Sequence, residues 1–96
     1  MKFRDYLKEL DQSHDGKVKP EHEDYFETEF KDVYEIDYDK EGFPTVIHRR
    51  DLENITAQDL AIIKRWVEWH NTRDDNDVVL MATDVTRDLG VSLARK

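Results

Sequence analysis

Apolar residues in the first third of the chain recur at helical spacing. Four of them predict a short amphipathic helix over residues 2–10, and these are Phe3, Tyr6, Leu7 and Leu10. A polar loop follows, and Pro20 stands where the first position of a second helix is expected, with acidic residues in the first turn. The pattern therefore predicts a helix–loop–helix segment whose second helix covers residues 20–31.

A β-hairpin is predicted in the middle of the chain, where the apolar period changes. Over residues 34–38 apolar and acidic side chains alternate, as in a strand with one buried face. Residues 39–48 supply a turn and a returning strand, which Pro44 would place at an edge of the sheet. The alternation extends back to residue 26, so the pattern leaves open whether residues 26–32 are helical or extended.

Two helices are predicted to close the chain. The first begins at Thr56, a good N-cap with Asp59 three residues later, and it carries two apolar stripes, so it should pack on two sides. The stripes are Leu60, Ile63 and Val67 on one side and Ile62, Trp66 and Trp69 on the other. The second helix is predicted from apolar residues at helical spacing between Val78 and Leu89, with Gly90 as its left-handed C-cap.

These elements predict a small α+β fold in which residues 1–96 form a single domain. Its order is a helix–loop–helix, a β-hairpin and then two C-terminal helices packed across the hairpin. A length of 96 residues suits one small domain with a thin core.

Charge is the strongest compositional signal. The chain has 23 acidic residues against 15 lysines and arginines, a net charge of −8. Residues 21–41 alone hold ten acids and two bases, so the whole net charge lies in this stretch. Because such a chain repels phosphate backbones and anionic lipids, we expect neither direct nucleic-acid binding nor membrane binding. Without cysteine, and without an apolar run long enough to span a bilayer, the expected location is the cytoplasm.

No phosphate-binding glycine loop, nucleophile motif or paired metal spacing is present, so we expect a protein that is not an enzyme and needs no cofactor. On a strand, Glu35, Asp37 and Asp39 share one face at intervals of about 6.6 Å. With Glu27 and Glu29 nearby, they predict a dense negative surface that binds a protein partner with a basic surface. A partly exposed Trp69 would be a further anchor for that partner, and the expected role is regulator, adaptor or inhibitor.

In charge and size the chain resembles small acidic phage proteins that imitate the DNA backbone, which act as anti-restriction and anti-CRISPR inhibitors. The resemblance is compositional and involves no shared motif. It implies a partner whose basic groove normally holds nucleic acid.

Residues 11–22 resemble the calcium-binding loop of EF-hand proteins. Six residues match loop positions one, three, five, six, seven and eight, and these are Asp11, Ser13, Asp15, Gly16, Lys17 and Val18. The resemblance implies calcium held by side-chain oxygens of Asp11, Ser13 and Asp15 and by the backbone carbonyl of Lys17. Position twelve is His22 instead of a bidentate glutamate, and imidazole is a poor ligand for a hard cation. A degenerate, single EF-hand-like calcium site is therefore the alternative function, and a glycine bend with capped backbone amides is the plain structural interpretation.

Overall fold

The computed structural model describes residues 2–13, 17–51, 54–73, 79–86 and 90–95. Over these ranges the chain forms a small α+β fold of three helices and a four-stranded antiparallel sheet. The elements are α1 (Phe3–Gln12), a 3₁₀ turn (Pro20–His22), α2 (Glu23–Val33), β1 (Tyr34–Tyr38), β2 (Pro44–Arg49), α3 (Ala57–Thr72), β3 (Leu80–Thr86) and β4 (Gly90–Arg95). None of these helices is long and apolar enough to cross a membrane.

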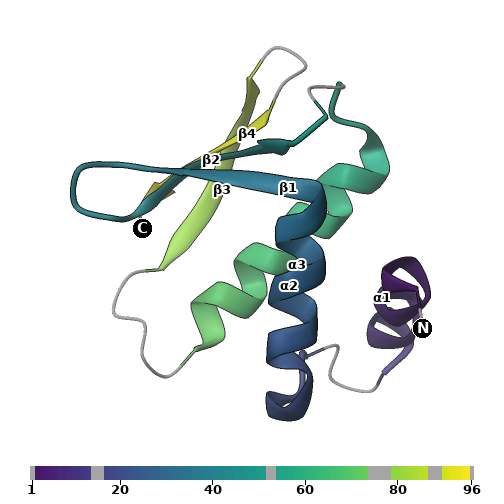
Figure 1. Cartoon of the computed structure of the whole chain (residues 1–96). Coiled ribbons are helices and arrows are strands. Elements are labelled where there is room, and N and C mark those ends of the chain that lie inside the picture. Colours follow the sequence, from purple (N-terminus) through teal and green to yellow (C-terminus); the bar gives the residue numbers. More distant parts are fainter. Residues whose placement is uncertain (1, 14–16, 52–53, 74–78, 87–89, 96) are drawn as a thin grey trace.

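Helices α2 and α3 lie against one face of the sheet, and the other face carries no helix of the described residues (Figure 1). Helix α1 packs against α2, where Phe3 and Tyr6 meet the ring of Phe26. The strand order is β1-β2-β4-β3, and each neighbouring pair is antiparallel. Buried side chains from all four strands point toward the helices, and these are Tyr34, Ile47, Leu80, Val91 and Leu93. An antiparallel sheet with one solvated face has this arrangement.

Phe30 lies at the centre of an aromatic core between α2 and α3. Its ring stacks on Tyr34 at a centroid distance of 4.7 Å and on Trp66 at 5.5 Å. One turn earlier, Phe26 meets Trp69 at 5.4 Å. Because positions four residues apart share a helix face, a helix buries both phenylalanines against α3. The stretch whose state the sequence left open is therefore helical.

The predicted hairpin is confirmed as β1 and β2, joined by a turn in which Gly42 has a φ of 87°. The prediction that Pro44 marks an edge is wrong, because β2 lies between β1 and β4. Pro44 is the first residue of its strand, a position where the missing N–H is tolerated.

The predicted second C-terminal helix is wrong, and a β-hairpin of β3 and β4 takes its place. The consecutive apolar residues 78–82 fit the spacing of a helix and that of a strand equally well, and the β-branched residues that follow favour a strand. Along β4, Val91 and Leu93 are buried and Ser92 is half-buried, which is the period of a strand. Val78 and Leu89, which bound the predicted helix, lie outside the described residues.

Gly90 is therefore no helix cap, and it begins β4 opposite His48 of β2. A Cβ atom at this position would lie 2.8 Å from the backbone oxygen of Ile47 and 3.0 Å from a methyl group of Val46. The two strands pack at this separation only because residue 90 has no side chain.

We predict that Gly90→Ala lowers the free energy of unfolding by about 1–3 kcal/mol, since backbone atoms must move apart to admit the methyl group. Gly42 offers a matched control, because open space surrounds it and its constraint is the positive φ. In urea denaturation, Gly42→Asn should lower the unfolding free energy less than Gly42→Ala does, since asparagine tolerates a positive φ. Gly90→Asn should be no milder than Gly90→Ala, and a milder effect would contradict the steric explanation.

Candidate functional site

The uncovered face of the sheet carries two carboxylates of β1. Glu35 and Asp37 alternate with the buried Tyr34 and the half-buried Ile36, so their side chains point away from the helices. Their side chains are 51% and 56% exposed. Both carboxylates are thus accessible to a partner that approaches this face.

His48 of β2 lies beside this pair of carboxylates, directly opposite Glu35 in the strand register. Its Nε2 atom is 3.5 Å from Asp37 Oδ1 and 4.0 Å from Glu35 Oε2. The imidazole carries a charge only when it is protonated, so with a neutral ring the group keeps two negative charges. We call Glu35, Asp37 and His48 the acidic sheet face.

Some other acids of the chain pair with lysine or arginine. Glu27 Oε1 lies 2.8 Å from Lys31 Nζ, and Glu41 Oε2 lies 3.0 Å from Arg95 Nη1. Within the described part of the chain, no lysine or arginine forms an ion pair with either carboxylate of the acidic sheet face. These two groups therefore stay available to cations of another molecule.

The remaining residues of the predicted negative surface lie elsewhere. Glu27 and Glu29 are on α2, on the helical side of the sheet, because residues 26–32 are helical. The carboxylate of Asp39 accepts hydrogen bonds from the backbone N–H groups of Glu41 and Phe43, both at 2.9 Å, and so stabilises the hairpin turn. Of the five acidic residues, the structure brings together only the two that lie within β1.

Trp69 is a core residue, only 5% exposed. Phe26 packs against its ring, and the guanidinium of Arg73 lies 5.0 Å above the ring centroid. The indole is therefore not the partly exposed anchor that the sequence suggested.

The loop that resembles an EF-hand begins inside α1. Asp11 is in the last turn of this helix and forms an ion pair with Arg65 of α3. Ser13 donates a hydrogen bond from its hydroxyl to the backbone oxygen of Leu10 at 2.7 Å, and Lys17 lies outside any helix or strand. Asp15 and Gly16 lie outside the described residues, and in the parts of the chain that are described no three acidic or histidine side chains form a metal-binding group. Calcium binding here stays a prediction.

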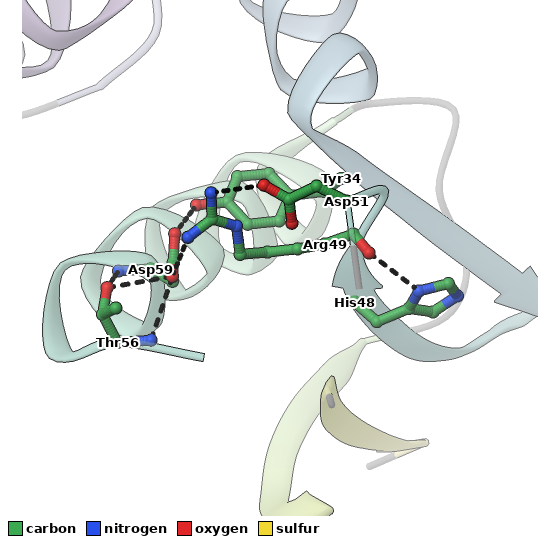
Figure 2. Close-up of polar contacts among 6 residues, drawn as sticks. All are labelled: Tyr34, His48, Arg49, Asp51, Thr56 and Asp59. Carbon is green, nitrogen blue, oxygen red and sulfur yellow. Dashed lines mark hydrogen bonds and ion pairs between the residues drawn. The ribbon is translucent and has the colours of Figure 1, made fainter. Parts of the chain in front are cut away.

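A buried polar network fixes the point where β1 begins (Figure 2). The hydroxyl of Tyr34 donates to Asp59 Oδ1 at 2.5 Å. Asp59 Oδ2 accepts from the backbone N–H and the hydroxyl of Thr56, both at 2.9 Å, and Thr56 Oγ1 accepts from the Asp59 N–H at 3.2 Å. This capping box starts α3 as predicted, and Arg49 Nη1 lies 3.4 Å from the same carboxylate.

The network holds Tyr34 neutral and Asp59 ionised. Burial alone would raise the pKa of Asp59, but the hydrogen bonds from Tyr34 and Thr56 and the charge of Arg49 outweigh it and lower the pKa of this carboxyl. Burial, together with the hydrogen bond to Asp59 and its negative charge, raises the pKa of Tyr34 far above its ordinary value. At neutral pH a phenol therefore donates to a carboxylate, which is a strong, charge-assisted hydrogen bond.

The sequence reveals half of this network. A threonine followed three residues later by an acid is a visible capping signal, whereas the partner of Tyr34 is 25 residues away and has no local signature. Because Tyr34 is 1% exposed and Asp59 is 6% exposed, the network supports the position of β1 and offers no access to a substrate.

Comparison with protein-family models, with curated proteins and with solved structures found no match to this chain.

We predict that Asp59→Ala costs about 2–4 kcal/mol of unfolding free energy, because it removes the carboxylate half of the capping box and leaves the buried Tyr34 hydroxyl without an acceptor. Thr56→Ala, which removes only the cap, should cost about 1 kcal/mol. Urea denaturation of both variants measures the difference. Equal losses would show that the bond to Tyr34 contributes nothing.

A second prediction concerns alkaline pH. Since the pKa of Tyr34 is raised on folding, its contribution is fully present below its unfolded value of about 10 and is lost as the pH rises beyond it. Above that pH, the ionisation of Tyr34 in the unfolded chain should lower the unfolding free energy by about 1.4 kcal/mol per pH unit. Tyr34→Phe lacks this group, so its stability should fall less steeply above pH 10 in urea denaturation between pH 8 and 11. Parallel curves for the two proteins would contradict the assignment.

Proposed function

We propose that this chain is a non-enzymatic binding protein whose acidic sheet face contacts a basic surface of a partner protein, as a regulator, adaptor or inhibitor. The observation that carries the proposal is the pair of exposed carboxylates, Glu35 and Asp37, on a sheet face without a covering helix and without a lysine or arginine partner among the described residues. A basic partner would supply the missing cations.

Like charges on one strand face make such a partner favourable. Residues 35 and 37 are about 6.6 Å apart along β1, so their carboxylates repel each other and stay hydrated in the free protein. Lysine or arginine side chains placed between them would relieve the repulsion. The net charge of −8 within residues 21–41 adds a long-range field that speeds encounter with a positive surface.

An inhibitor that occupies a nucleic-acid-binding groove is one specific form of this proposal. The concentration of negative charge in a short segment of a small chain supports it. A competition experiment distinguishes such an inhibitor from a protein that binds another basic surface. Only the inhibitor and the nucleic acid would displace each other from the captured partner.

The test is charge reversal at the acidic sheet face. Glu35→Lys with Asp37→Lys should slow association with a basic partner captured from a cell lysate at least tenfold at low salt, while the fold stays intact because both sites are exposed. A matched control is Asp24→Lys with Asp32→Lys, two exposed positions of α2 that change the net charge equally. Stopped-flow rates and their salt dependence give the readout.

The control should keep most of the wild-type rate. Equal losses in both double variants would show that net charge, and not the acidic sheet face, controls binding. An unchanged rate in the β1 variant would overturn the proposal.

A further inference from the structure

The sheet has two edges, and they differ. The strand order places β1 and β3 at the outside. At the start of β3, the amide side chain of Asn71 accepts from Leu80 N–H and donates to Leu80 C=O, both at 2.8 Å, as a neighbouring strand would. A register shift between Ala82 and Asp84 interrupts β3 further along, and another lies between Asp37 and Tyr38, near the end of β1. Among the described residues, β1 pairs only with β2, so its other side is open.

The register shows which backbone groups of β1 face the open edge. Arg50 N–H donates a hydrogen bond to Val33 C=O at 2.9 Å. Val33 precedes Tyr34 and Arg50 follows Arg49, so this bond lies next to the cross-strand pair of Tyr34 and Arg49. A bond at this place means that Tyr34 and Arg49 form a non-hydrogen-bonded pair of the antiparallel ladder. Because the two kinds of pair alternate along a strand, Ile36, two residues further on, also belongs to a non-hydrogen-bonded pair. Its N–H and C=O groups therefore point away from β2 and toward the open edge.

A groove of about 270 Å³ lies along this edge, and its lining residues are Lys31, Tyr34, Glu35, Ile36, Tyr38 and Arg50. Tyr38 is 54% exposed and Ile36 is half-buried, so they offer apolar surface on the side of the strand that faces the helices. Toward the end of α2, Arg50 Nε donates to the backbone oxygen of Lys31. The carboxylates of Glu35 and Asp37 thus point to one side of the edge, and Ile36 and Tyr38 offer apolar surface on the other, where Lys31 and Arg50 also line the groove.

We infer that β1 takes up an extended segment of the partner as an additional strand of the sheet. Lysine or arginine residues at alternate positions of that segment would lie beside Glu35 and Asp37, and the apolar residues between them would lie against Ile36 and Tyr38. The inference rests on the proposed function and specifies the partner as a segment that alternates basic and apolar residues.

Charge complementarity selects this occupant over a second copy of the chain. Pairing of β1 with β1 of another copy, centred on Ile36, would place Glu35 of each copy opposite Asp37 of the other on the same face. Such like-charge pairs are destabilising, and charged residues on an edge strand are a common protection against self-pairing. The same carboxylates that oppose self-association favour a basic strand.

The test uses seven-residue peptides that alternate lysine with valine. A residue opposite Ile36 exchanges both backbone hydrogen bonds with it, so the valines supply the N–H donors and the lysine N–H groups point away. N-methylation of the valines should weaken binding at least tenfold. The matched control, N-methylation of the lysines, should bind within about threefold of the unmodified peptide, since only a hydrogen bond that is made contributes.

Two further readouts concern the protein. Hydrogen exchange of the Ile36 amide should slow at least tenfold on addition of the unmodified peptide, and Glu35→Lys with Asp37→Lys should abolish this protection. Asp24→Lys with Asp32→Lys should retain it. These NMR measurements identify the site without relying on the N-methylated peptides.

Equal binding of both N-methylated peptides, with an unprotected Ile36 amide, would overturn strand addition while leaving the proposed function intact. Absence of any binding at millimolar peptide would also overturn it, and capture of a basic partner from lysate would still test the proposed function separately. Sedimentation of the protein alone should find a monomer. A dimer that dissociates on Ile36 N-methylation in synthetic protein would identify a second copy as the occupant and refute the inference.

Discussion

The hydrogen bond between Tyr34 and Asp59 sets the orientation of β1, on which the candidate site depends. Tyr34 follows α2 directly and is held inward by Asp59 of α3 and by the ring of Phe30. Because side chains of a strand alternate, an inward residue 34 places residues 35 and 37 on the opposite face. One buried phenol thereby decides that two carboxylates meet solvent, and a slip of one residue would turn them into the core.

The sequence predicted the elements whose patterns are local, and it failed where two periods fit equally well. The first hairpin and the capping box of α3 follow from alternation over residues 34–38 and from the spacing of Thr56 and Asp59. The C-terminal hairpin did not, because a run of consecutive apolar residues satisfies both helix and strand, and the choice depends on pairing between β4 and β2. Burial of Trp69 likewise depends on Phe26, which is 43 positions earlier in the chain.

The acidic stretch shows how a linear cluster of charge is divided by folding. Its first half lies on α2, where a helix spreads side chains around its axis and Glu27 pairs with Lys31. Its second half enters β1, where the period of two collects Glu35 and Asp37 on one face. Composition therefore predicted the sign of the candidate surface, and three-dimensional structure determined which residues form it.

The position of β4 in the sheet has a consequence for how the protein is made. This strand comes after every other described element in the chain, yet it lies between β2 and β3 and supplies Val91 and Leu93 to the core. During synthesis, β2 and β3 emerge from the ribosome without the strand that joins them, so the sheet forms only after residues 90–95 have been translated. Pairing of β4 with β3 is local, whereas pairing of β4 with β2 joins residues more than 40 positions apart and is expected to be slow compared with closure of the local hairpin.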